Sequence, residues 1–119
     1  MDKRVDHQSF HSASPTNPSI SINGGDASTD NSSVTLSISA LDDDGVVGYF
    51  IANNGSTPSA DASGWTIVTS TDNYSDNISY TLSGNTGSLK TINVWFKDVD
   101  GTLSSSDNDS IMFCNSETL

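Results

Sequence analysis

Two aspartate-rich turns carry the side chains of this sequence that are best suited to chemistry. Their carboxylates belong to Asp42, Asp43, Asp44, Asp98 and Asp100. A glycine follows each group, and neither turn contains a lysine or an arginine. Carboxylate oxygens on short turns suit Ca²⁺, and crowded like charges favour a neutralising cation. The sequence therefore predicts a calcium site if the fold brings both turns together, although Asp and Gly also form ordinary turns without a metal.

The histidines argue against catalysis. His7 and His11 are the only two, and both lie in a polar N-terminal segment without hydrophobic periodicity. A Ser-His-Asp or Cys-His arrangement needs a histidine on the rigid part of the fold. Their i, i+4 spacing would suit zinc on a helix, but the surrounding residues show no helical pattern and offer no further ligands. We therefore expect no enzymatic activity.

The charge balance excludes several classes of partner. The chain has 15 acidic and 4 basic residues, giving a net charge of -11 and a pI of about 4.1. So acidic a surface repels nucleic acid and anionic lipid. No apolar run approaches the length of a membrane span, so we expect no membrane insertion. Cys114 is the single cysteine, which rules out an internal disulfide.

Hydrophobic residues recur with a period of two, which is typical of half-buried strands. Val34, Leu36 and Ile38 alternate with hydroxyl side chains, and Val94 and Phe96 share one face of a second strand with Ile92. These six residues are predicted to form a shared core. Strands are expected near residues 20–22, 34–40, 46–52, 65–69, 78–82, 89–98 and 111–113. About seven short strands separated by turns predict an all-β, antiparallel immunoglobulin-like β-sandwich of two sheets, with a β-barrel as the alternative.

The predicted organisation is a single folded domain with two flanking segments. Residues 1–17 are polar and aperiodic, and we expect a disordered tail or linker there. The sandwich is assigned to residues 18–114, and residues 115–119 to a C-terminal tail. Deleting residues 1–14 is therefore expected to leave the melting temperature nearly unchanged.

The sandwich would place the two acidic turns at the same end, because residues 42–44 would join strands B and C and residues 98–100 would join strands F and G, and these two loops meet at one end of the fold. It would also turn Trp95 and Phe50 outward, on the face opposite Val94 and Phe96. Exposed aromatics of this kind stack on sugar rings or on a protein partner. The alternative is that the loop of residues 53–64 covers Trp95.

The folded part of the chain resembles the bacterial Ig-like (fibronectin type III-like) repeats of large extracellular proteins. The matching segments are Ser33-Val34-Thr35-Leu36, Ala40-Leu41-Asp42, Gly48-Tyr49-Phe50-Ile51, Gly64-Trp65, Lys90-Thr91-Ile92-Asn93-Val94-Trp95-Phe96-Lys97-Asp98, Asp100-Gly101 and Ser110-Ile111. Such repeats occur in surface adhesins and as spacers in exported enzymes. The resemblance implies an extracellular or cell-surface location and a fold, whereas a fold alone does not supply a function.

The combined interpretation is a non-catalytic structural or adhesion module of a multidomain bacterial surface or secreted protein, with Ca²⁺ as its one candidate cofactor. Its expected partners are the neighbouring domains of the same chain, with a carbohydrate or a surface protein as further candidates, and the isolated chain is expected to be a monomer. The alternative is a carbohydrate-binding accessory module of a secreted hydrolase, which would need two or more exposed, roughly coplanar aromatics. A protein-recognition domain that uses an edge strand is a third option.

Overall fold

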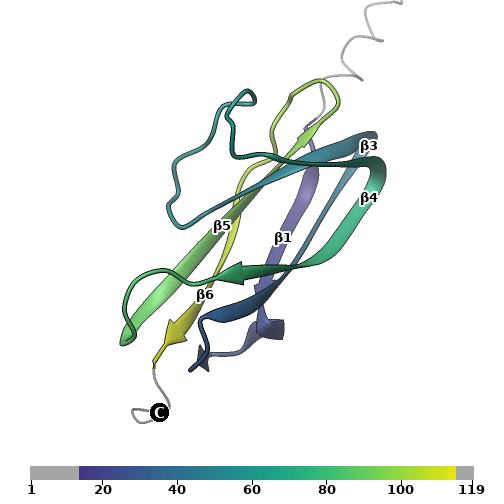
Figure 1. The fold of residues 1–119 in the computed structure, drawn as a ribbon. Coiled ribbons are helices and arrows are strands. Elements are labelled where there is room, and N and C mark those ends of the chain that lie inside the picture. Colours follow the sequence, from purple (N-terminus) through teal and green to yellow (C-terminus); the bar gives the residue numbers. More distant parts are fainter. Residues whose placement is uncertain (1–13, 115–119) are drawn as a thin grey trace, which may run out of the picture.

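The computed structural model describes residues 14–114, and this part of the chain is built from strands (Figure 1). Its elements are β1 (Thr16–Ile22), the 3₁₀ turn η1 (Asn23–Gly25), β2 (Ser28–Thr29), β3 (Ser33–Ala52), β4 (Thr66–Thr81), β5 (Ser88–Asp98) and β6 (Asp107–Phe113). The prediction of an all-β chain is confirmed. No helix within these residues is long and apolar enough to span a membrane. The expectations for residues 1–13, including His7 and His11, and for residues 115–119 lie outside the described part.

The core follows the predicted period of two. Val34, Leu36 and Ile38 of β3 are buried, as are Val94 and Phe96 of β5 together with Ile92. The same cluster also contains Ile20, Ile22, Ala40, Val46, Tyr74, Leu82, Ile111 and Phe113. Each large side chain removed from water in this way contributes on the order of 1.5–3 kcal/mol. The predicted core is therefore present, with contributions from five of the six strands.

Strands β3 and β4 form one long antiparallel ribbon that bends near its middle (Figure 1). Their pairing runs from Ser33↔Thr81 to Leu41↔Asn73, shifts, and resumes at Val46↔Thr71. The expected turn at residues 42–45 is therefore wrong, because these residues form a bulge inside a continuous strand. Gly45 permits the bend with a φ of 106°, and a Cβ at this position would overlap the Ser70 hydroxyl.

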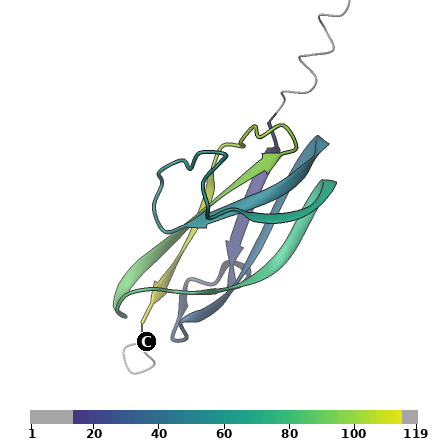
Figure 2. The same cartoon turned by 45° about the horizontal axis from the view of Figure 1, so that its top comes forward.

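The two halves of β3 take different partners. Its first half pairs with β1 through Ser21↔Ser37, and its second half pairs with β5 through Phe50↔Trp95. Strand β6 then pairs with β5, and the short β2 pairs with β6 in parallel. The result is a curled sheet with the order β1-β3-β5-β6-β2, with β4 on the other side of β3 (Figure 2). The parallel pair corrects the expectation of an entirely antiparallel arrangement.

The sheet has two recognisable ends (Figure 1). The bend end contains residues 41–45 of β3 and residues 98–101 after β5, which meet through the pair Val46↔Asp98. Strand β1 begins there, since Thr16 pairs with Leu41. The distal end contains residues 82–90 and the last residues of β6, which meet through the pair Ser88↔Phe113. The 11 residues of β5 separate the two ends, a span of roughly 33–36 Å at strand geometry.

Candidate functional site

The structure brings two of the five predicted carboxylates together in the interior of the bend end. Asp42 lies on the inward face of β3 with 7% of its surface exposed, and Asp98 is the last residue of β5 with 1% exposed. Burial raises the pKa of the Asp42 carboxyl above its ordinary value of 3.8, and the charge of the nearby Asp98 raises it further. These two side chains therefore form a buried acidic pair.

Each member of this pair uses one oxygen to shape the backbone. Asp42 Oδ1 accepts a hydrogen bond of 2.7 Å from the Asp44 amide. Asp98 Oδ1 accepts bonds of 2.9 Å from the amides of Asp100 and Thr102. The Oδ2 atoms of Asp42 and Asp98 are buried and find no hydrogen-bond partner within residues 14–114. Because a buried carboxylate oxygen without a partner is costly, these two atoms mark the pair as a candidate site.

The predicted five-ligand calcium site is not assembled. Asp43 and Asp100 are exposed, and Asp44 is half-buried. Strand alternation within the bulge turns Asp43 away from Asp42, which the expectation of a compact turn had missed. In the described region, no three acidic, histidine or cysteine side chains lie close enough to hold one metal ion. Since Ca²⁺ takes six to eight oxygens, Asp42 and Asp98 would need main-chain carbonyls, water or a neighbouring domain to complete its coordination.

The predicted aromatic site is closed by a loop. Trp95 faces outward from β5 as expected, but only 1% of its surface is exposed. Phe50 packs edge-on against it, with ring centroids 6.1 Å apart, and also against Trp65, at 5.5 Å. The loop of residues 53–65 crosses this face, and Gly64 lies directly against the Phe50 ring. The indole of Trp95 is therefore covered, as in the alternative interpretation of the sequence, and is not available for stacking on a sugar.

Lys97 fastens the loop over this aromatic cluster. Its Nζ atom lies 4.8 Å from the centroid of the Trp65 ring and donates a 2.9 Å hydrogen bond to the carbonyl of Ala60. The Trp65 indole N–H in turn donates to the carbonyl of Ser59 at 2.9 Å. The loop is thus held by a cation–π contact and by side-chain bonds to its own backbone. The sequence signal for this arrangement was a tryptophan at the end of a Gly- and Ser-rich segment.

A second pair of aspartates has a role that sequence reasoning missed. Asp107 Oδ2 accepts a 3.0 Å hydrogen bond from the Ile20 amide, and Asp109 Oδ2 accepts one of 2.8 Å from the Ile22 amide. The carboxylates of β6 therefore satisfy backbone donors on the outer edge of β1 and join these strands side by side. The available signal was the spacing, because Asp107 and Asp109 share one strand face with the buried Ile111.

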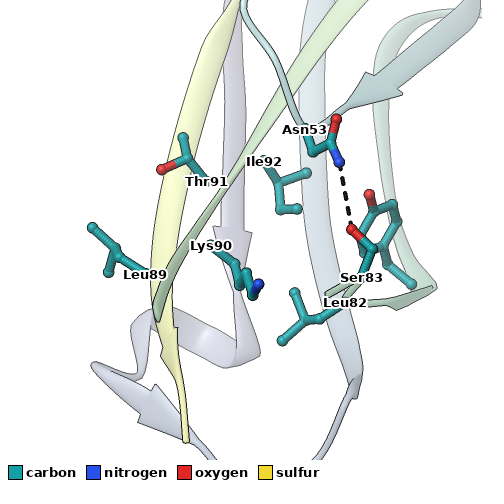
Figure 3. A pocket seen from close by; sticks show the side chains of 8 residues that line it. Asn53, Leu82, Ser83, Leu89, Lys90, Thr91 and Ile92 are labelled. Carbon is teal, nitrogen blue, oxygen red and sulfur yellow. Dashed lines mark hydrogen bonds between the residues drawn. The ribbon is translucent and has the colours of Figure 1, made fainter. Parts of the chain in front are cut away.

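A small cavity of about 160 Å³ opens at the distal end between β4 and β5 (Figure 3). It is lined by Asn53, Tyr80, Leu82, Ser83, Leu89, Lys90, Thr91 and Ile92. Lys90 and Ile92 reach into the space between the strands, whereas Leu89 points away from it (Figure 3). Asn53 Nδ2 and Ser83 Oγ lie 3.5 Å apart across one side. The cavity thus combines apolar walls with one ammonium group.

Comparison with protein-family models, with curated proteins and with solved structures finds no match to this chain.

Proposed function

We propose that this chain is a non-catalytic structural unit that transmits tension between its neighbours in a longer extracellular protein. The observation that carries the proposal is the position of its ends. Strand β1 begins at the bend end and β6 finishes at the distal end (Figure 1). A force that pulls the bend end and the distal end apart would therefore act along the strands.

The contact between β1 and β6 has the geometry that resists such a pull. Asp107 bonds to Ile20, Asp109 bonds to Ile22, and Met112 pairs with Ser28, so the two segments advance in the same direction. Tension would draw β1 and β6 in opposite directions along their length. Because all these bonds then oppose sliding at once, they would have to break together.

We propose further that the curled sheet is a sandwich of the immunoglobulin-like kind that the sequence resembles. Strand β1, residues 33–41 of β3 and residues 73–81 of β4 would form one layer. Residues 46–52 of β3, residues 66–71 of β4, β5 and β6 would form the other. The different partners of the two halves of β3, and the register shift between them, support this division. A solution NMR structure that lacks contacts between these layers would exclude it.

Single-molecule force spectroscopy on the full chain, held at its two termini, tests the proposed function. We expect one cooperative unfolding event, because forced unfolding is governed by the barrier to breaking the native contacts. Asp107→Ala with Asp109→Ala should lower the unfolding force, while Asp30→Ala, an exposed aspartate between β2 and β3, should leave it unchanged. Gradual extension at low force, identical in wild type and double variant, would overturn the proposal.

We also propose that the bend-end pair binds Ca²⁺ when a neighbouring domain or main-chain carbonyls complete the coordination. The two unpartnered Oδ2 atoms of Asp42 and Asp98 support this, since a cation would satisfy both at once. Bound there, Ca²⁺ would stiffen the junction that precedes β1.

A further inference from the structure

We infer that the distal end of this domain binds an extended peptide with an acidic side chain, and that the peptide adds as a short strand beside β5. The inference goes beyond the proposed mechanical role and does not rest on it. It is carried by an unpaired stretch of strand edge, by the cavity that this edge lines and by the lysine that reaches into the cavity.

Strand β5 has two neighbours along only part of its length. Strand β6 pairs with residues 88–94 of β5, whereas the pairing with β3 stops at Ala52↔Asn93. Beyond this pair, β3 leaves the sheet and the chain enters the loop of residues 53–65. Within the described part of the chain, residues 88–92 therefore have a free edge on the side of β3. Alternate backbone N–H and C=O groups along this edge have no strand to pair with.

The cavity between β4 and β5 lies along this free edge (Figure 3). Residues 89–92 all line it, although Leu89 points away while Lys90 and Ile92 reach into it. Because successive residues of a strand face opposite sides, four consecutive lining residues indicate that the backbone of β5 forms one wall. Leu82 lies across the space from it (Figure 3). A strand placed along this edge would bond to β5 and send every second side chain into the cavity.

The size of the cavity favours a peptide over a separate small molecule. Its volume is about 160 Å³, whereas sites for drug-sized ligands enclose roughly 300–1,000 Å³. A cavity this small accommodates one or two side chains, and the main chain that carries them stays at the free edge. Affinity then comes from main-chain hydrogen bonds, and specificity comes from the side chains that enter.

Lys90 makes an acidic side chain the preferred occupant. By strand alternation it shares the core-facing side of β5 with Ile92 and Val94, both of which are buried. No acidic residue lines the cavity. The other lysine of the described region, Lys97, is already engaged with the Trp65 ring and a main-chain carbonyl. A carboxylate opposite Lys90 and an aliphatic side chain opposite Ile92 would form two favourable cross-strand pairs.

The direction of the neighbouring strand sets the order of these two side chains in the peptide. Strand β3 runs antiparallel to β5, and a peptide that continues its line runs in the same direction. Such a peptide would face Ile92 first and Lys90 two positions later, and the residue between them would face outward beside Thr91. The expected motif is therefore an aliphatic residue, a residue that favours strands, and an acidic residue.

The contact is weak for a free peptide. Five residues form few hydrogen bonds and lose conformational entropy on binding, so we expect a Kd on the order of 1 mM. The net charge of -11 also repels acidic ligands at long range. Comparisons between matched peptides and between variants of Lys90 separate the local charge pair from this general repulsion.

Heteronuclear NMR of the full chain, titrated with the acetylated and amidated peptide Val-Thr-Glu-Thr-Val up to about 5 mM, tests the inference. We expect amide shifts at residues 88–92 and at Asn53 and Ser83, and none at Asp43 of the bend end. The matched control is Val-Glu-Thr-Thr-Val, which has the same composition but turns its carboxylate outward. It should bind about two- to fivefold more weakly.

Variants of Lys90 test the charge pair. The wild type should prefer Val-Thr-Glu-Thr-Val over Val-Thr-Gln-Thr-Val by about two- to fivefold. Lys90→Met keeps most of the apolar stem and should remove this preference, and Lys90→Glu should prefer Val-Thr-Lys-Thr-Val instead. Thr69→Asp, at an exposed position in the bend half of β4, lowers the net charge by the same amount as Lys90→Met and should keep the wild-type preference.

Methylation of the peptide backbone tests the strand pairing. Only alternate N–H groups of a strand face one neighbour. N-methylation of the glutamate and N-methylation of the threonine before it should therefore differ. One of these two peptides should lose binding to β5, and the other should retain most of it.

Three outcomes would overturn the inference. Absence of shifts at residues 88–92 at the highest peptide concentration excludes the site. Equal binding of the peptide and its rearranged control, or equal effects of the two methylations, excludes a strand in this register. Shifts with sodium glucuronate but not with the peptide would assign the cavity to a small acidic sugar. The force measurement uses the chain without peptide, so each of these outcomes leaves the proposed mechanical role to be judged separately.

Discussion

Two pairs of aspartates on the same sheet are treated in opposite ways by the fold. Asp107 and Asp109 each direct Oδ2 at a backbone amide of β1. Asp42 and Asp98 bury theirs without any partner among the described residues. The difference comes from what lies opposite each side chain. The outer edge of β1 offers N–H groups, whereas at the bend Oδ1 takes the nearby turn amides. A carboxylate in a strand therefore stabilises the fold only where an unused donor faces it.

The apolar core provides the reference value of the free energy of unfolding with which the effects of both aspartate pairs can be compared. Leu36 is fully buried between the strands. Leu36→Ala should lower the free energy of unfolding by about 2–5 kcal/mol, because the substitution removes apolar contact and leaves a cavity. Urea titration followed by far-UV circular dichroism measures this. Met112→Ala, at an exposed position, is the matched control and should cost well under 1 kcal/mol.

Among the aspartates, Asp107 and Asp109, which bond to the edge of β1, should show the largest effect on the free energy of unfolding when they are substituted. Asp109→Ala removes the acceptor of the Ile22 amide, and we expect a loss of about 1.5–3 kcal/mol, as for other hydrogen bonds to a charged group. Amide hydrogen exchange resolved by residue should show reduced protection at Ile22, with Ile20 less affected. Asp30→Ala serves as the control. Unchanged protection at Ile22 would mean that the carboxylate does not hold β1.

Substitution of Asp42 in the buried Asp42–Asp98 pair should raise the free energy of unfolding, which is the opposite of the effect expected for Asp109. Asp42→Asn keeps the Oδ1 acceptor for the Asp44 amide and gives the second position an amide that can donate to Asp98. We therefore expect this variant to be more stable at neutral pH by about 1–2 kcal/mol. Asp43→Asn, at an exposed position, should change stability by less than 0.5 kcal/mol.

The pH dependence of this gain follows from the pKa of Asp42. Since the folded state raises this pKa, ionised Asp42 destabilises the fold at neutral pH, and the penalty disappears as the pH falls through the raised value. The advantage of Asp42→Asn should thus be present at pH 7 and be lost as the pH approaches 3.8, the ordinary value of the group. A gain that persists at pH 3 would contradict this explanation.

The smallest effect is expected from Ca²⁺. For a Kd of about 10⁻⁴–10⁻³ M, 1 mM Ca²⁺ stabilises the folded state by roughly 0.4–1.4 kcal/mol, which raises the melting temperature by a few degrees. Asp42→Asn with Asp98→Asn should remove the rise, and Asp107→Asn with Asp109→Asn should keep it. Identical melting curves in Ca²⁺ and in chelator would show that the isolated unit has no such site.

The hydrophobic period of the sequence predicted which strand residues are buried. It did not predict which distant segments lie opposite those residues in the fold. Alternation alone located Leu36 and Val94 in the core and turned Trp95 outward, because strand geometry fixes these directions. It left open whether the loop of residues 53–64 covers that tryptophan, since loop paths follow from tertiary contacts. The Asp-Gly pattern at residues 42–45 was interpreted as a turn. In the structure these residues stay within β3, which pairs with β4 on both sides of them.

The candidate site was predicted only in part, again because the local sequence pattern does not contain the tertiary contacts. Bringing Asp42 near Asp98 required only the expected strand connections, whereas the exposure of Asp43 follows from the bulge. The role of Asp107 and Asp109 needed the position of β1 relative to β6, which no local pattern contains. A spacing of two on a face shared with Ile111 was nonetheless a sign that these carboxylates point toward the protein.

The bent ribbon also bears on how the chain folds. Strands β3 and β4 are joined by the loop of residues 53–65, so their pairing can close from a short loop outward at modest entropic cost. The pairs between β3 and β5, from Ala52↔Asn93 to Val46↔Asp98, span longer stretches of sequence and should form afterwards. Because β3 and β4 both pass through the bend, each of these strands contributes residues to both halves of the sheet. We therefore expect refolding kinetics with a single phase, and no intermediate in which one half is formed without the other.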